Sequence, residues 1–167
     1  KDTALNLVGG YSFTEQMKSL GKVPVSKVLS FEKIEANKYL ANHLNVRLGT
    51  KLIKIKRLRI ADDIPMMLER TFLPLNQFLT LTKERLEEKA MYDIFKEDFQ
   101  VTIKLAEEDF YASVVTSSDA QLLKIHEGAP VLHLVRKTYN MKNEIIEFTE
   151  SSARGDQFRY KIVHSRF

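Results

Sequence analysis

Two β-rich runs separated by a short turn constrain the fold of this chain more than any other feature. Residues 51–60 and 64–73 are rich in Ile, Leu, Met, Phe and basic residues, and Ala61-Asp62-Asp63 between them has the composition of a turn. This arrangement predicts an antiparallel hairpin. Further strand-like runs lie at 23–33, 101–115, 130–140, 144–152 and 157–164. Because most successive runs are joined by short turns, we expect the α+β class, an antiparallel β-sheet with helices packed over one face or one end.

Four segments are expected to be helical. The first covers residues 13–20, where Glu15 follows Ser12 at the spacing of a capping box and Gly21 ends the helix. The others are 37–44, the Leu- and Glu-rich segment 76–97, and a segment that begins at the N-cap candidates Ser117-Ser118-Asp119 and ends near Gly128.

Composition and motif content exclude several classes of protein. The 167 residues contain no Cys, which rules out disulfide scaffolds, Cys-based zinc sites and thiol catalysis. The four histidines lack metal-ligand spacing, and there is no Gly-rich phosphate loop, nucleophile elbow or dinucleotide fingerprint. We therefore expect neither a metal nor a cofactor. Because the sequence has no linker or low-complexity run, residues 1–167 are expected to form a single domain.

The charge pattern argues against direct contact with nucleic acid, and the hydropathy pattern argues against a membrane. The net charge of +4 comes from 26 basic and 22 acidic residues that are interleaved along most of the chain. A phosphate-backbone footprint needs a denser basic face, even though the isoelectric point is about 9.2. No run approaches the roughly 18 apolar residues that a membrane span requires.

Two arginines stand two positions apart on the first run of the predicted hairpin. Strand alternation places Arg57 and Arg59 on the same side as Ile53 and Ile55. If that side is buried, the guanidinium groups need an anion, either Glu69 on the returning strand or a bound anionic ligand. Glu69 faces the arginines if odd positions pair with odd positions, and faces away after a one-residue shift. From spacing alone, an exposed salt-bridged strand is the simpler interpretation.

Three further residues are candidates for a binding site. Phe13 and Thr14 lie at a helix start, where backbone amides and a hydroxyl can bind an anion, although an ordinary helix cap is the simpler interpretation from sequence alone. Glu147 lies between Ile146 and Phe148 on a predicted strand, and is either an acceptor for a ligand hydroxyl or an exposed residue of an alternating pattern.

The order of four sequence stretches resembles the effector-binding (UTRA) domain of GntR-superfamily, HutC-type transcription regulators. The likeness runs through nearly the whole chain. The stretches are Lys56-Arg57-Leu58-Arg59-Ile60-Ala61-Asp62-Asp63-Ile64-Pro65 with Glu69 and Phe72-Leu73-Pro74 after it; Met91-Tyr92-Asp93-Ile94-Phe95; Gly128-Ala129-Pro130-Val131-Leu132 through Arg136-Lys137-Thr138-Tyr139; and Ile146-Glu147-Phe148 followed by Arg154-Gly155-Asp156-Gln157-Phe158-Arg159-Tyr160.

The resemblance implies a chorismate-lyase-like fold in a cytoplasmic protein that works as a homodimer. A ligand pocket is expected between the sheet and the helices. In such regulators an N-terminal winged helix-turn-helix domain, absent from this chain, binds operator DNA. Residues 1–11 then correspond to a remnant of the interdomain linker. The expected effector is a small anionic metabolite, a sugar phosphate or amino-sugar phosphate.

The resemblance also implies roles for the candidate residues. Arg57 and Arg59 match the arginines that hold the phosphate, and Phe13 and Thr14 match the loop that closes over it. The acids Glu69 and Glu147 match residues that hydrogen-bond sugar hydroxyls.

Two positions depart from the family pattern, and two other functions stay open. Ala90 stands where a Ser often contributes to the phosphate site, and Ala153 stands where an aromatic residue often precedes Arg-Gly-Asp.

In the enzyme alternative, a chorismate-lyase-like catalyst acts on a small carboxylate substrate, with Glu69 or Glu147 in acid-base catalysis. A purely structural dimerisation module is the other alternative.

Overall fold

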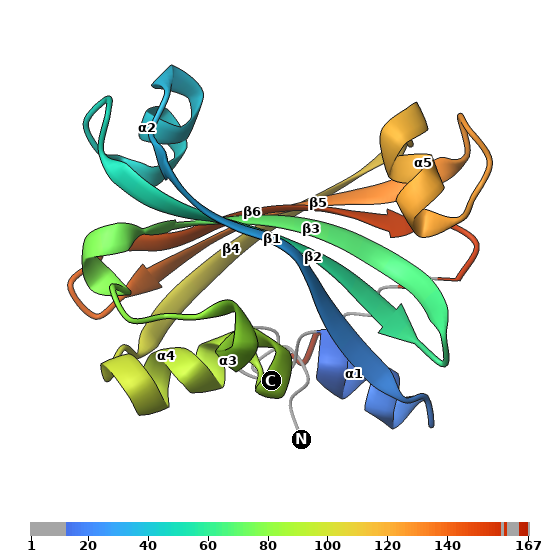
Figure 1. Cartoon of the computed structure of the whole chain (residues 1–167). Helices are drawn as coiled ribbons and strands as arrows, with labels where there is room; N and C mark the ends of the chain where they lie inside the picture. Colours follow the sequence, from blue (N-terminus) through green and yellow to red (C-terminus); the bar gives the residue numbers. More distant parts are fainter. Residues whose placement is uncertain (1–12, 158, 160–163, 167) are drawn as a thin grey trace.

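A six-stranded antiparallel sheet forms the centre of the fold (Figure 1). The structure is a computed structural model and describes residues 13–157, 159 and 164–166. The strands are β1 (Pro24–Glu35), β2 (Lys51–Ala61), β3 (Ile64–Pro74), β4 (Ile103–Val114), β5 (Pro130–Asn140) and β6 (Ile145–Arg154). The helices are α1 (Phe13–Ser19), α2 (Lys38–Leu44), the 3-10 turn η2 (Leu75–Gln77), α3 (Lys83–Glu88), α4 (Met91–Phe99) and α5 (Ser117–Leu123). The predicted α+β class with an antiparallel sheet is confirmed.

The predicted hairpin is present as β2 and β3. The chain reverses at Asp62 and Asp63, whose φ values of 49° and 65° are those that a two-residue hairpin turn requires. The sheet order is β1-β2-β3-β6-β5-β4. It therefore consists of two meanders of consecutive strands, β1 to β3 and β4 to β6, and the pairing of β3 with β6 joins them.

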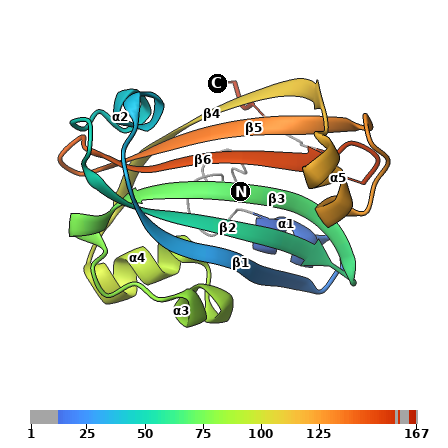
Figure 2. The same ribbon diagram turned by 45° about the horizontal axis from the view of Figure 1, so that its top comes forward.

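Helices cover both faces of the sheet. Figures 1 and 2 show α1, α3 and α4 on one face, and α2 and α5 on the other face at opposite ends of the strands. Phe95 of α4 packs in a cluster with Ile53 of β2, whereas Leu44 of α2 packs with Phe148 of β6. The sequence predicted helices over one face or one end only. That expectation is too narrow because β3 is buried along nearly its whole length, and a strand buried on both faces needs cover on both.

The segment 76–97, predicted as helical throughout, is not continuous. It contains α3 and α4, which are separated where Lys89 leaves the helical conformation with a φ of −145°. Thr82 caps α3 by accepting a hydrogen bond from the Arg85 amide at 3.2 Å. The break allows Leu86 of α3 and Phe95 of α4 to reach the same buried cluster.

The ends of the other elements differ from the predictions by small amounts. The cap of α5 is Thr116, one residue before the expected Ser117, and the helix ends at Leu123 rather than near Gly128. The capping residue Ser12 and the segment 1–11 lie outside the described residues, as do 158 and 160–163 of the strand expected at 157–164. Gln157, Arg159 and 164–166 are described and are not in a strand. In the part of the chain that the structure describes, the helices all fall short of the length and apolar character that a bilayer crossing demands.

Candidate functional site

Charged and hydroxyl side chains form a buried row on the sheet face that carries α1, α3 and α4. Strand alternation brings them together on this face. This polar row runs from β2 to β5 and consists of Arg57, Arg59, Glu69, Ser151, Thr149, Glu147, Thr138 and Arg136. All are buried except Arg136, whose side chain is 14% exposed. The exposed alternatives considered for Arg57, Arg59 and Glu147 are therefore wrong.

The register of the hairpin places Glu69 beside both arginines. Odd positions pair with odd positions, and Glu69 lies directly opposite Arg57. Arg57 Nη2 and Arg59 Nη1 both donate to Glu69 Oε1, at 3.1 and 2.7 Å. The other carboxylate oxygen, Oε2, accepts from Ser151 Oγ at 3.2 Å. Two guanidinium groups thus share a single carboxylate oxygen.

Charge is distributed unevenly along the polar row. Burial raises the pKa of Glu69, but the charges of Arg59 and Arg57 outweigh it and lower the pKa to about 2. Burial and the neighbouring Arg59 lower the pKa of Arg57 to about 10, so this guanidinium is still charged at neutral pH. The β2 end of the row therefore carries two positive charges against one negative charge. A buried excess of positive charge favours the binding of an anion at the β2 end of the row.

Glu147 lies near the other end of the row, fully buried within a hydrogen-bond network. Its Oε1 accepts from the Tyr92 hydroxyl and from Thr138 Oγ1, and its Oε2 accepts from Thr149 Oγ1. Arg136 Nη1 lies 3.7 Å from Oε2. Most of the acceptor capacity of this carboxylate is therefore used within the protein.

Tyr92 and Arg136 belong to this site, although the sequence analysis did not single them out as binding residues. The Arg136 guanidinium lies over the Tyr92 ring, 6.0 Å from its centroid, and its Nε donates to Glu108 at 2.7 Å. Burial raises the pKa of Tyr92 well above its usual value, so its hydroxyl stays protonated. Both residues fall within the stretches that carry the family resemblance, and that was the one available signal.

Phe13 of α1 covers the arginines. The guanidinium of Arg59 lies 4.9 Å from the centroid of the Phe13 ring, and the ring is 5% exposed. Thr14 follows it within α1, but its side chain lies outside the described part of the structure. The structure thus brings together Phe13, Arg57, Arg59 and Glu69, with Glu147 farther along the row.

A cavity of about 510 Å³ opens beside the positive end of the polar row. This arginine cavity lies between the end of α1, the start of β1, the middle of β2 and the junction of α3 with α4. Its polar lining residues and Ala90 are Lys18, Ser26, Arg57, Arg59, Glu87, Glu88, Lys89, Ala90 and Asp93. Its volume lies within the range of about 300 to 1,000 Å³ that small-molecule sites occupy.

The N-terminus of α4 lies at the wall of this cavity. Ala90 is the N-cap, and no side chain caps the helix. A smaller cavity of about 20 Å³ is lined by residues of this helix start together with three arginines: Arg57, Arg59, Ala90, Met91, Tyr92 and Arg136. The first turn of a helix carries unpaired amides and a partial positive charge, which add to that of the arginines.

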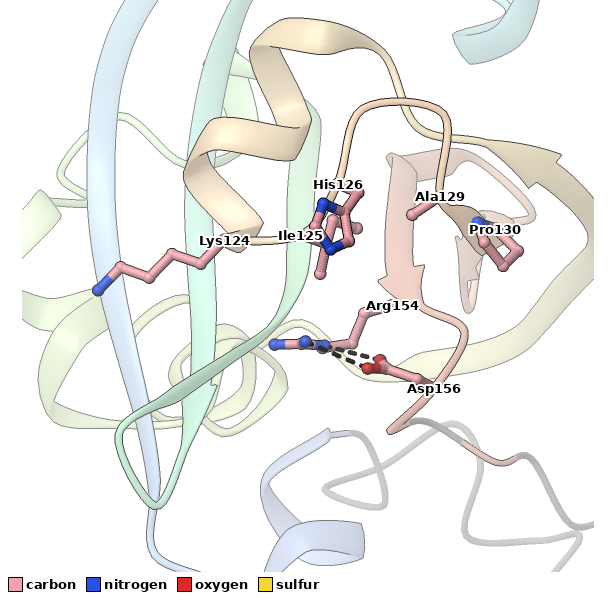
Figure 3. Close-up of a pocket in the computed structure, with 7 residues that line it drawn as sticks. All are labelled: Lys124, Ile125, His126, Ala129, Pro130, Arg154 and Asp156. Atoms are coloured by element: carbon pink, nitrogen blue, oxygen red, sulfur yellow. Dashed lines mark hydrogen bonds and ion pairs between the residues drawn. The ribbon is translucent and has the colours of Figure 1, made fainter.

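A second cavity of similar volume, about 510 Å³, lies where α5 meets the end of β6 (Figure 3). Its arginine, Arg154, already donates to Asp156 at 2.9 Å and to the Pro65 carbonyl at 3.2 Å. Lys124 also lines this cavity. Because Arg154 has a carboxylate to itself whereas Arg57 and Arg59 share one, this cavity is the weaker candidate for an anion.

The histidines do not gather around a common point. His43 stacks on Phe148 with the ring centroids 4.4 Å apart, and His133 contacts the Tyr111 ring. Over the described ranges, no group of three or more His, Asp or Glu side chains is suited to hold a metal ion.

Sequence comparisons relate the chain to transcription regulators. The family model described as "UTRA domain" matches residues 19–159. The chain is 34% identical to the HTH-type transcriptional repressor NagR of Bacillus subtilis over 95% of its length, and 26% identical to the mannosyl-D-glycerate transport/metabolism system repressor MngR of Escherichia coli over 93%. It spans 64% of the length of each of these relatives. These relatives are regulators, which favours a regulatory domain over an enzyme.

Solved structures agree at the level of the fold. The effector domain of PhnF from Mycobacterium smegmatis superposes with a TM-score of 0.85 at 22% identity, over 95% of this chain and 98% of that one. A GntR-family transcriptional regulator from Enterococcus faecalis superposes with a TM-score of 0.78 at 18% identity, over 83% and 99%. With the family model matching most of the chain, this chain belongs to the UTRA domain family.

Proposed function

We propose that this chain is the effector-sensing domain of a transcription regulator and that its effector is a small anionic metabolite, a sugar phosphate or amino-sugar phosphate. The phosphate binds Arg57 and Arg59 in the arginine cavity, and Phe13 with Thr14 closes over it. Glu69 and Glu147 accept hydrogen bonds from sugar hydroxyls. Each carboxylate has about four acceptor positions, so a ligand hydroxyl can join the contacts already made within the protein.

The observation that carries this proposal is the pair of buried guanidinium groups that share one carboxylate oxygen at a cavity wall. A phosphate supplies the missing negative charge and enough oxygens for both guanidinium groups. The uncapped start of α4 supports the same ligand because backbone amides there bind phosphate oxygens. The relative MngR is named for a mannosyl-D-glycerate system, which is consistent with a sugar-derived effector.

Regulation needs parts that lie beyond this chain. The relatives are named HTH-type regulators and are longer than this chain, so we propose that an additional domain in the full-length cytoplasmic protein binds operator DNA. We also propose that the domain works as a homodimer. The effector changes DNA binding if it binds one dimer arrangement more tightly than the other, since equal affinity for both shifts no equilibrium.

The chemistry of the acids argues against the chorismate-lyase-like alternative. A general acid or base works best when its pKa lies near the working pH. The two arginines hold the pKa of Glu69 at about 2, which makes this carboxylate a weak base. Glu147 accepts three hydrogen bonds, from Tyr92, Thr138 and Thr149, so this carboxylate acts as a hydrogen-bond acceptor and the one position that remains suits a ligand hydroxyl.

A binding titration with paired variants tests the proposal. Isothermal titration with hexose and hexosamine 6-phosphates should show saturable binding that the unphosphorylated sugars lack. Arg57→Met should weaken binding about tenfold to hundredfold, since a charged hydrogen bond contributes about 1.5 to 3 kcal/mol. The variant should fold because Arg59 still neutralises Glu69.

Lys54→Met is the matched control for this titration. Lys54 lies on the same strand but faces the opposite side of the sheet, so the substitution removes one charge without touching the cavity. Equal affinity of Arg57→Met and Lys54→Met for the sugar phosphate would exclude the proposed phosphate site.

A further inference from the structure

Two buried polar atoms beside the arginine cavity lack a hydrogen-bond partner among the described residues. They are Ser26 Oγ and Arg57 Nε. Buried polar groups in folded proteins are nearly always paired, and each exception calls for an explanation. Because Ser26 and Arg57 both line the arginine cavity, the two exceptions point to the same place.

Ser26 lies next to the phosphate-binding arginines on the neighbouring strand. It is directly opposite Arg59 in the pairing of β1 with β2, so the two side chains extend from the same face of the sheet. Its hydroxyl is turned inward without a partner. Rotation about the single χ1 bond of a serine moves the hydroxyl between staggered positions. Because Ser26 lines the arginine cavity, we expect such a rotation to bring the hydroxyl to a bound ligand without a backbone change.

The position of Ser26 compensates for a missing hydroxyl on the opposite wall. The α4 N-cap is Ala90, which has no hydroxyl, and it lines the same cavity. The cavity therefore has a hydroxyl on the β1 wall in place of one on the α4 wall. A tetrahedral phosphate presents oxygens in several directions, so donors on different walls can bind it together.

We infer that Ser26 is a phosphate-binding residue of this domain and that its hydroxyl donates to the same phosphate group that Arg57 and Arg59 hold. This inference rests on the proposed sensing of a phosphorylated metabolite. It adds a third side-chain donor, on β1, to the two on β2. It also predicts that ligand binding gives the buried hydroxyl the hydrogen-bond partner that it otherwise lacks.

Titration of the wild type and three variants, Ser26→Ala, Ser26→Thr and Ser30→Ala, with inorganic phosphate and the same hexose 6-phosphates tests this inference. Ser26→Ala should weaken phosphate-compound binding about tenfold or more, the loss expected for a hydrogen bond to a charged group. Ser26→Thr, which keeps the hydroxyl, should remain close to the wild type. Ser30→Ala on the same strand serves as the control because Ser30 pairs with Lys56 on the opposite face.

A thermal melt without ligand separates binding from structure. If Ser26 serves the ligand, Ser26→Ala leaves the melting temperature unchanged or raises it, since the hydroxyl removed has no partner. A lower melting temperature for Ser26→Ala than for Ser30→Ala would overturn the inference in favour of a structural role.

The remaining outcomes distinguish this inference from the proposed function. If Ser26→Ala binds as tightly as the wild type while Arg57→Met does not, the role of Ser26 is excluded and the phosphate site stands. If the wild type binds none of the phosphate compounds, both are excluded. Recovery of affinity in Ser26→Ala/Ala90→Ser would support the view that the two positions supply the same hydroxyl.

Discussion

Glu69 is the residue on which the charge balance of the arginine cavity depends. It accepts hydrogen bonds from Arg57, Arg59 and Ser151, and without its charge two guanidinium groups would be buried together. Since its pKa is lowered from 4.5 to about 2 on folding, the folded state binds its proton less readily than the unfolded chain does. This contributes about 3 kcal/mol to folding above pH 4.5, and the contribution is lost as the pH falls towards 2.

We expect the Glu69 carboxyl to stay ionised through the pH range in which ordinary glutamates take up a proton. Carbon-13 NMR of the side-chain carboxyl should show no titration between pH 6 and about pH 3.5. A midpoint near the ordinary value of 4.5 would mean that the arginines do not hold this carboxylate. Urea unfolding at several pH values should show the matching loss of stability on the acid side.

Sequence reasoning reached some residues of the site and not others for physical reasons. Strand alternation placed Arg57 and Arg59 on one face, but the register that brings Glu69 to them depends on the turn at Asp62 and on packing along the strand. Ser26 could not be found because a single serine on a strand has no pattern. Its significance comes from the absence of a hydrogen-bond partner for its buried hydroxyl, which only the three-dimensional structure reveals.

The start of α4 at the cavity wall differs from the start of α2 on the opposite face of the sheet (Figure 1). Asn37 caps α2 by accepting from the Leu40 amide at 2.9 Å, whereas Ala90 at the start of α4 has no capping side chain. Ser, Thr, Asp and Asn are the favoured capping residues. The N-cap residue of α4 therefore satisfies none of the first amides of this helix with its side chain.

Two cap substitutions should change stability in opposite directions. Asn37→Ala removes a cap and should lower the free energy of unfolding by about 1 kcal/mol, while Ala90→Ser adds one and should raise it by about the same amount. Urea unfolding of the ligand-free protein measures both. No gain from Ala90→Ser would show that the α4 amides already have other partners.

The local sequence pattern predicts an element correctly where a single turn or a single buried face determines its structure. The β2–β3 hairpin follows from its strands and its Asp62-Asp63 turn. The break between α3 and α4 does not, since no Gly or Pro stands between Leu86 and Met91. The break arises because two separate helix faces are needed to fill one cluster, and such a tertiary requirement overrides local helix propensity.

Elements far apart along the chain meet at the arginine cavity, so ligand binding should report on global stability. The cavity walls come from α1, β1, β2 and the α3–α4 junction, which meet only in the folded chain. A ligand that binds the folded state alone raises the free energy of unfolding by about 2.7 kcal/mol at one hundred times its dissociation constant. Urea unfolding with and without a bound hexose phosphate measures this gain, and Arg57→Met should reduce it. A full gain in that variant would indicate binding elsewhere, such as the cavity beside Arg154.

The two three-stranded meanders are related by an internal structural repeat. Each half of the molecule has the element order helix, strand, helix, strand, strand, and β1, α2 and β2 begin 79 positions before β4, α5 and β5. The arrangement in Figure 1 has the corresponding approximate twofold symmetry, with α2 and α5 as one pair and α1 and α4 as another. Phe13 and Tyr92 are also 79 positions apart, and each ring contacts a guanidinium group, that of Arg59 and that of Arg136, although these two arginines are not at equivalent positions.

This internal symmetry is broken at one point that matters for the ligand. Arg57 and Arg136 occupy equivalent positions, also 79 residues apart, but their cross-strand neighbours differ. On the outer strand of each half, Glu108 of β4 lies opposite Arg136 and accepts from its Nε, whereas the apolar Val28 of β1 lies opposite Arg57. The carboxylate partner of Arg57 is Glu69 on β3, which it shares with Arg59. Arg136 thus has a carboxylate on its outer neighbouring strand, whereas Arg57 shares Glu69 with Arg59 and has an Nε without a hydrogen-bond partner among the described residues. The two halves therefore have nearly the same arrangement of helices and strands, but only the half that contains Arg57 has two arginines sharing one carboxylate. We therefore expect a single ligand to bind per chain.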